Sequence, residues 1–281
     1  MMNESQAVPQ SAPQGAAQGR PGILLEVRPD GLSFPEPPAF ASKEAERIHV
    51  KERLAAGYRI FALQGFDAGI AGHISARDPV LPDHFWVNPL AVHFSRIRVS
   101  DLVLVDHAGN IVEGRHPVNA AAFAIHSRIH AARPDVIAAA HSHSRFGTTF
   151  ASLGRTIPPI TQEACAFYKD HSVLQAYGGI ASELSEGELI AQALGPHKAV
   201  ICRNHGHFTV GQSVEAAVFW FMRMERAFEQ CLLAWNAGQP IEIDDETAML
   251  TRKQVGSPRA GWFGMQPLMD KIIAEQPDLC E

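Results

Sequence analysis

The sequence predicts an α/β fold in which helices and strands alternate along one main domain. Segments with apolar residues at helical spacing interleave with short apolar runs bounded by Pro, Asp, Asn and Gly, and no internal repeat is present. The 281 residues are 46% hydrophobic and 19% charged, a balance that supports a sizeable core. A disordered chain and a small disulfide-stapled scaffold are therefore excluded.

The two ends of the chain differ from its middle. Twelve of the first twenty residues are Gln, Ala, Pro or Gly without a hydrophobic period, so we expect residues 1–38 to form a flexible arm. Residues 39–240 carry the alternating pattern and are expected to form the main domain. Residues 241–281 hold an apolar cluster near a short helix, and this tail is expected to pack on the domain or on a neighbouring subunit.

The first half of the domain is expected to begin with a helix and continue as a sheet. Lys43–Phe61 has apolar residues at helical spacing and is followed by Gly65. Between Gly69 and Val112 the sequence pattern changes to short apolar runs separated by turn residues. These runs predict strands of a mixed or antiparallel sheet, with a hairpin turn at Ala108-Gly109-Asn110.

The second half of the domain returns to alternating helices and strands. Ser213 is a good N-cap for the last and strongest amphipathic helix. The segment that contains Glu163, Tyr168 and His171 is expected to be a loop. The predicted helices are Asn119–His130, Ser144–Leu153, Glu186–Leu194 and Ser213–Trp235, and the predicted strands are Val136–Ala140 and Ala199–Cys202.

Charge and cysteine usage limit the possible partners and location. Lys and Arg number 24 against 30 Asp and Glu, so the chain lacks the basic surplus that binds nucleic acid. No basic segment followed by an apolar run begins the chain, and no apolar stretch is long enough to span a membrane. The four cysteines are widely spaced and are expected to be buried thiols of a cytoplasmic protein.

Two histidine motifs follow apolar runs and suggest a metal site. In His141-Ser-His143, side chains two apart on a strand point to the same face and can reach one ion. His205, in the run Arg203-Asn-His-Gly-His207, offers a third imidazole at the end of another strand. Three such ligands are typical of a catalytic metal that keeps positions open for substrate. Taken alone, the first motif also fits histidines that bond only to the backbone.

The runs NAAAFAIHSRIHAARPDVIAAAHSHS and KAVICRNHGHFTVGQSVEAA resemble the class II aldolase and adducin family, and GHISAR, HFWVNPLAVHF and GNIVEG resemble its adducin-type branch. The resemblance extends from about Lys43 to Trp235. It implies a three-layer α/β/α sandwich around a mixed central sheet. It also implies that the metal ligands are His141, His143 and His205, and that the protein is a homotetramer with active sites at subunit interfaces.

Two departures from the family pattern bear on the chemistry. The sugar-phosphate aldolases of the family carry a Glu, four residues before a helical His, that ligates metal and moves protons. The matching helical His is His126, so the Glu position is Ala122, which can do neither. The Asn of the family's phosphate-binding loop is His73, so a phosphorylated sugar is a poor candidate substrate.

Four further residues are candidates for catalysis. Glu163 could replace the lost acid or orient a ligand imidazole, although a solvated carboxylate is equally plausible for a loop. Arg145 could pair with a substrate carboxylate or simply form a surface salt bridge. His171 could move protons, and His126 could line the pocket. His207 is expected to support the ligands or face solvent rather than bind metal.

Three functions remain open at this point. The chain resembles the iron-dependent decarboxylating oxygenases of aminocoumarin antibiotic biosynthesis, which use Fe²⁺ and O₂ to convert a prenylated 4-hydroxyphenylpyruvate, through the mandelate, to the benzoate. Aromatic residues in HFWVNPLAVHF, ACAFY and FWFM favour such an aryl 2-oxo acid, unless they only fill the core. The alternatives are a Zn²⁺ or Mn²⁺ lyase, an aldolase or decarboxylase acting through an enediolate, and a non-catalytic adducin-like interaction module. Against the last alternative, the chain lacks the long basic tail through which adducins bind partners, and it keeps the metal-ligand histidines.

Overall fold

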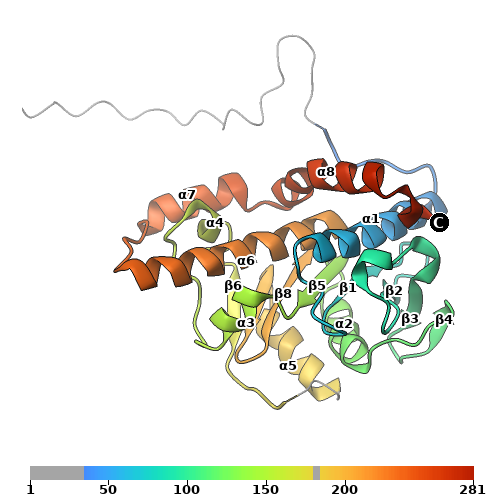
Figure 1. Cartoon of the computed structure of the whole chain (residues 1–281), viewed down its shortest axis with the longest axis horizontal. Coiled ribbons are helices and arrows are strands. Elements are labelled where there is room, and N and C mark those ends of the chain that lie inside the picture. Colours follow the sequence, from blue (N-terminus) through green and yellow to red (C-terminus); the bar gives the residue numbers. More distant parts are fainter. Residues whose placement is uncertain (1–34, 180–183) are drawn as a thin grey trace, which may run out of the picture. The chain divides into compact units, whose positions relative to one another are not determined.

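An eight-stranded mixed sheet forms the centre of the fold (Figure 1). The structure is a computed structural model that describes residues 35–179 and 184–281. The strand order is β4-β3-β2-β1-β5-β8-β7-β6, and neighbours are antiparallel except β6 and β7, which are parallel. The strands are β1 (His73–Arg77), β2 (His84–Val87), β3 (Val103–Asp106), β4 (Ile111–Glu113), β5 (Ala138–Ser142), β6 (His171–Leu174), β7 (Ala199–Cys202) and β8 (Gly206–Gly211).

Helices cover both faces of this sheet, as Figure 1 shows, and confirm the predicted three-layer sandwich. On one face Leu54, Phe221 and Met265 from α1, α6 and α8 share one apolar cluster. On the other face Ile125 of α2 and Ile190 of α5 pack against β7 and β8. The helices are α1 (Lys43–Leu63), α2 (Ala120–Ala132), α3 (Arg145–Ala151), α4 (Gln162–Cys165), α5 (Leu184–Leu194), α6 (Val214–Ala237), α7 (Asp245–Val255) and α8 (Pro258–Glu275).

Most predicted elements are present, with shifted ends. The Ser213 side chain accepts a hydrogen bond from the Ala216 amide and caps α6, as expected. The hairpin at Ala108–Asn110 is also confirmed, since it joins β3 to β4. Strand β5 begins two residues later than predicted and continues through Ser142, because the polar end of the strand pairs with both β1 and β8. His141 therefore lies inside the strand.

Two expectations about local structure are wrong. The segment around Glu163 and His171 is not a loop: Glu163 lies in the short helix α4, and His171 begins the edge strand β6. These elements have four residues each, too few to show a periodic pattern. Cys280 is exposed, whereas the other three cysteines are buried thiols as expected.

The C-terminal tail is longer and more helical than its sequence suggests. Helices α7 and α8 replace the expected single short helix, and Met265, Met269 and Ile272 of α8 join the core cluster of α1 and α6. The tail thus packs on its own chain. Of the expected N-terminal arm, residues 1–34 lie outside the described residues. No helix in the described part of the chain has the length and apolar character needed to cross a bilayer.

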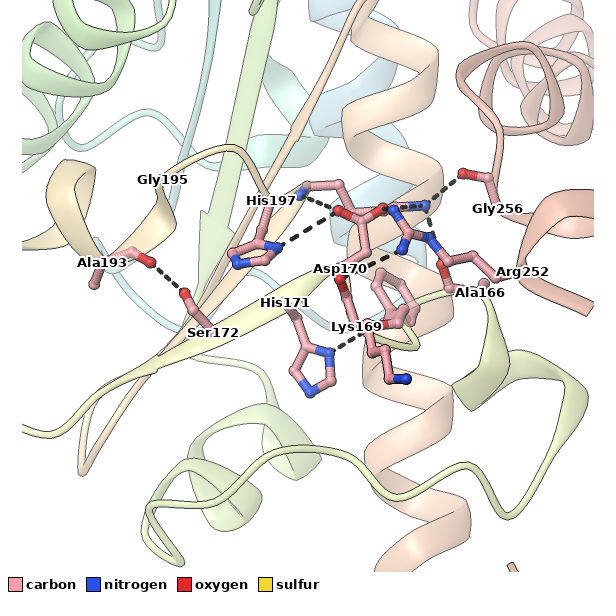
Figure 2. A network of polar contacts seen from close by, with 12 residues as sticks. Ala166, Lys169, Asp170, His171, Ser172, Ala193, Gly195, His197, Arg252 and Gly256 are labelled. Atoms are coloured by element: carbon pink, nitrogen blue, oxygen red, sulfur yellow. Dashed lines mark hydrogen bonds and ion pairs between the residues drawn. The ribbon is translucent and has the colours of Figure 1, made fainter. Parts of the chain in front are cut away.

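A partly buried charge network connects the tail to the edge of the sheet (Figure 2). Asp170, just before β6, lies 3.2 Å from the Lys198 ammonium and 3.1 Å from the Arg252 guanidinium of α7. Lys198 also donates to the carbonyls of Ala166 and Gly256, so its half-buried ammonium group has three partners. These contacts connect β6, β7 and α7, and we interpret the network as structural.

Candidate metal centre

Three imidazoles meet where β5 ends and where β7 turns into β8. The ligand atoms of His141, His143 and His205 all lie within 4.8 Å of one another. Their ring centroids are 4.8 to 5.2 Å apart, and the rings are steeply inclined to each other. His141 is buried, His205 is half-buried and His143 is exposed. The cluster is therefore open to solvent on one side.

The strand geometry presents one nitrogen of His141 to this cluster. The His141 ring stacks on Phe208, with centroids 4.0 Å apart and planes 9° apart. Its Nδ1 donates a 2.8 Å hydrogen bond to the backbone carbonyl of His207. Such an outer partner fixes the tautomer of a ligating histidine, so Nε2 is left for a metal.

The turn between β7 and β8 carries His205 toward the cluster. Asn204, just before it, adopts a left-handed conformation with φ 62°, which Asn tolerates better than most residues. Gly206, just after it, has φ 151°, and a Cβ there would lie 3.4 Å from the Cε1 of His141. The backbone conformations of Asn204 and Gly206 form the tight turn that brings His205 to His141.

Desolvation favours the neutral form of the three imidazoles, which is the form that binds metal. Desolvation lowers the pKa of His143 and lowers that of His205 to about 4, where the nearby His143 adds to the effect. The pKa of His141 is also lowered by its burial. Among the described residues, no carboxylate oxygen lies within 4.8 Å of all three nitrogens. Three neutral nitrogen donors with an open side fit a divalent transition metal.

Glu225 of α6 anchors the segment that carries His143, and sequence reasoning missed it. Its carboxylate accepts hydrogen bonds from the Ser144 hydroxyl at 2.5 Å and from the amides of Phe146 and Gly147 at 2.7 Å. It thereby caps the first turn of α3, directly after His143. Burial raises the pKa of this carboxyl group. No local signal distinguishes Glu225 from the other charged residues of its helix.

The position of the family's acid is apolar here. Ala122 is fully buried and packs in a cluster with Phe85, Val87, Val103 and Val105. His126, one turn further along α2, is also fully buried, and its Nε2 contacts His73 at 2.6 Å. His126 therefore lies behind His73 rather than at an open surface.

Arg145 and Glu163 line one cavity, whereas His171 lies elsewhere. The cavity has a volume of about 560 Å³ and is also lined by Phe146, Arg223 and Glu225, but by none of the three clustered histidines. Exposed Arg145 follows His143 by two residues and begins α3.

His171, labelled in Figure 2, is the first residue of β6, which is an edge strand of the sheet. Its paired positions run from β6 through β7 and β8 to Ala140 of β5. Three strand spacings therefore separate His171 from Ala140, which is about 14 Å. Its Nδ1 donates to the Phe167 carbonyl, and its Nε2 accepts from the Ile157 amide. Both ring nitrogens are used, and the structure does not bring this residue to the cluster.

Most of the aromatic residues that suggested an aromatic ligand fill the core. Phe85, Trp86, Phe167 and Phe221 are fully buried. His207 is buried as well and stacks on Phe221 at 4.0 Å, so its ring faces α6 rather than the ligands or solvent. Only its backbone carbonyl supports His141.

Comparisons with known proteins identify the family and the fold of the chain. Residues 52–232 match the family described as the Class II Aldolase and Adducin N-terminal domain. The chain is 44% identical to decarboxylase NovR of Streptomyces niveus, over 88% of this chain and 92% of that protein. It is 43% identical to 4-hydroxy-3-prenylphenylpyruvate oxygenase/4-hydroxy-3-prenylbenzoate synthase of Streptomyces roseochromogenus subsp. oscitans, over 88% and 90%. A solved structure titled L-fuculose 1-phosphate aldolase from Glaciozyma antarctica is 44% identical, with a TM-score of 0.82 over 88% and 97% of the two chains.

Proposed function

Because the chain belongs to the class II aldolase and adducin family, we propose that it is a non-haem iron(II)-dependent oxygenase that oxidatively decarboxylates an aryl 2-oxo acid. The substrate would be of the 4-hydroxyphenylpyruvate type, including its prenylated form, as the name of the Streptomyces roseochromogenus relative suggests. One observation carries the proposal: the metal centre offers three neutral imidazoles, while the acid position of the aldolases is Ala122, buried among apolar side chains. At the position of Ala122 there is therefore no carboxylate to transfer the proton that an aldol cleavage requires.

The proposed reaction has two oxidations. In the first, the 2-oxo acid and O₂ give the mandelate-type 2-hydroxy acid and CO₂. In the second, that hydroxy acid and another O₂ give the aryl carboxylate, CO₂ and water. A ferrous ion held by His141, His143 and His205 would supply the open coordination positions and the redox chemistry that O₂ requires.

The remaining candidates take supporting roles in this proposal. We propose that Arg145 pairs with a substrate carboxylate, and its exposure and its position two residues from His143 support this role. Glu163 lines the same cavity as Arg145. Burial lowers the pKa of the nearby Arg223 guanidinium, and the charge of Glu163 offsets part of that effect. His126 acts through His73 rather than on the substrate. The satisfied hydrogen bonds of His171 argue for a structural role.

We also propose a cytoplasmic homotetramer with the metal centre at a subunit interface. The family resemblance implies that assembly, and the exposed face of the centre at His143 supports it, because a second subunit would enclose the open side. Four unpaired cysteines agree with a reducing compartment.

Metal exchange tests the proposed chemistry against the lyase alternative. We expect protein loaded anaerobically with Fe²⁺ to consume 4-hydroxyphenylpyruvate only after O₂ is admitted, and the zinc- and manganese-loaded forms to be inactive. The structure titled as an aldolase makes L-fuculose 1-phosphate the appropriate comparison substrate. Oxygen-independent cleavage of that sugar phosphate by the zinc form, with no oxygen uptake on the aryl acid by the iron form, would replace the oxygenase proposal with the lyase.

A further inference from the structure

The cavity of about 560 Å³ lies on the opposite side of β5 from the clustered histidines. Ser142 and Ser144 alternate with the histidine ligands along the chain, so their side chains point away from the metal centre. The Ser142 hydroxyl donates to the carbonyl of Phe66, and the Ser144 hydroxyl donates to Glu225. Both acceptors belong to residues that line the cavity. The backbone of this segment therefore separates the cavity from the metal centre.

Apolar and aromatic side chains form part of the cavity wall. Phe66 is buried, and its ring contacts two buried phenylalanines of the core. Phe146, Phe219 and Met222 are half-buried and also pack against the core. The wall is thus held by the packing of the domain, and the volume is in the ordinary range of small-molecule sites. These properties fit a ligand with an aromatic ring.

Two arginines of α6 line the same cavity without a partner. Arg223 and Arg226 are one turn apart on the helix. Within the described part of the chain, neither guanidinium group forms a hydrogen bond or an ion pair. The Nε of Arg223 is buried, and its guanidinium carbon lies over the ring of Phe219, 5.5 Å from the centroid. A buried N–H group without an acceptor is costly, so a ligand that supplies an acceptor is favoured here.

The carboxylates of the cavity leave this positive charge available. Glu225 is committed to the first turn of α3, from which it accepts three hydrogen bonds. Glu163 and Glu229 also line the cavity, but among the described residues neither pairs with an arginine. The charge of Glu163 only offsets part of the effect of burial on the pKa of Arg223. A ligand at Arg223 therefore meets a guanidinium group that no side chain neutralises at contact distance.

We propose that this cavity is a second binding site, separate from the metal centre, for an aromatic carboxylic acid. The carboxylate binds Arg223 and Arg226, because guanidinium groups bind carboxylates with paired, charge-assisted hydrogen bonds. The ring lies against the three phenylalanines of the wall. Arg145 also lines the cavity, but it follows His143 closely and the proposed function assigns it to the metal-bound substrate. The site does not depend on the proposed oxidation, since none of its residues binds the metal.

Calorimetric titration with 3-(4-hydroxyphenyl)propionate tests the site. This acid has the ring and the carboxylate but lacks the keto or hydroxyl oxygen that would help it to chelate a metal. We expect one equivalent to bind with the same affinity to anaerobic iron-loaded protein and to metal-free protein. The uncharged 4-propylphenol should bind at least about tenfold more weakly. Absence of binding by the acid, or binding that requires the metal, would overturn the proposal.

Two arginine variants test which residue binds the carboxylate. Arg223→Gln keeps a polar side chain but removes the charge, and we expect it to weaken binding of the acid about tenfold to hundredfold. Arg96 is exposed and lies outside the cavity, so Arg96→Gln should bind the acid like the wild type. A thermal melt of each variant establishes that it is folded. Equal affinities of the two variants would overturn the proposal.

Glu163 distinguishes an acid from an amino acid as the ligand. Glu163→Gln removes a negative charge close to Arg223, so it should strengthen binding of the acid about twofold to fivefold. An ammonium group would instead use the free carboxylates of the cavity. Weaker binding of the acid by Glu163→Gln, or tighter binding of L-tyrosine than of the acid by the wild type, would therefore contradict an acid as the ligand.

Discussion

Alanine in place of His143 is expected to abolish metal retention and leave the fold intact. Removing a group that only hydrogen-bonds to a metal ligand typically lowers metal affinity about 10- to 100-fold. Loss of one of the three ligands themselves should therefore lower it more than about 100-fold. His143 is exposed, and its replacement leaves no cavity in the core. Metal analysis after gel filtration of protein purified without chelators, alongside a thermal melt of the metal-free forms, measures both effects.

A matched histidine separates this effect from a general loss of surface imidazoles. His116 is also partly exposed, and it lies 3.7 Å from Asp101, outside the cluster. His116→Ala should retain metal like the wild type. Metal content in His143→Ala equal to that of His116→Ala would remove the proposed centre.

The metal-free protein is expected to lose stability steeply as the pH falls below about 6.5. Burial lowers the pKa of His126, His130 and His207 to about 3. In the unfolded chain these rings protonate near pH 6.5, so between about pH 6.5 and 3 the unfolded state binds more protons and acid favours it. Each ring lowers the free energy of unfolding by about 1.4 kcal/mol per pH unit. The three together therefore lower it by roughly 6 kcal/mol by about pH 5. That is a large part of the stability of an ordinary domain.

Urea unfolding at several pH values measures the free energy of unfolding and so gives the sign and the slope of its pH dependence. The carboxylates whose pKa is lowered, such as Asp78, contribute their pH dependence only near and below pH 4, so they do not produce a loss between pH 6.5 and 5. His207→Asn removes one of the three buried rings and should reduce the slope by about 1.4 kcal/mol per pH unit, whatever its effect at pH 7. Stability that is flat from pH 7 to 5 would show that these histidines are charged in the folded state.

The sequence predicts the elements well where an apolar run coincides with a strand or helix. Ala199–Cys202 is predicted to the residue, because an apolar run between turn residues is the whole of β7. The prediction for β5 ends too early, because His141 and Ser142 are polar while their backbone still pairs with neighbouring strands. Elements α4 and β6 are too short for any period to appear.

The candidate site is predictable only where its geometry is local. His141 and His143 share a face because strand side chains alternate, and this follows from spacing alone. Glu225 reaches Ser144 across 81 residues, and His73 reaches His126 across 53. Such contacts depend on how helices pack on the sheet. The sequence marks Ala122 as the missing acid, and the structure adds that its surroundings are apolar.

The ratio of carbon dioxide released to oxygen consumed tests the central claim most directly. Protein loaded anaerobically with Fe²⁺ is given 4-hydroxyphenylpyruvate in a sealed cell, O₂ is admitted, and both gases are followed by membrane-inlet mass spectrometry. The proposed chemistry predicts one CO₂ for each O₂ through both oxidations, with the 2-hydroxy acid appearing before the benzoate. Release of CO₂ without oxygen uptake, or no reaction with the iron-loaded protein, would contradict it.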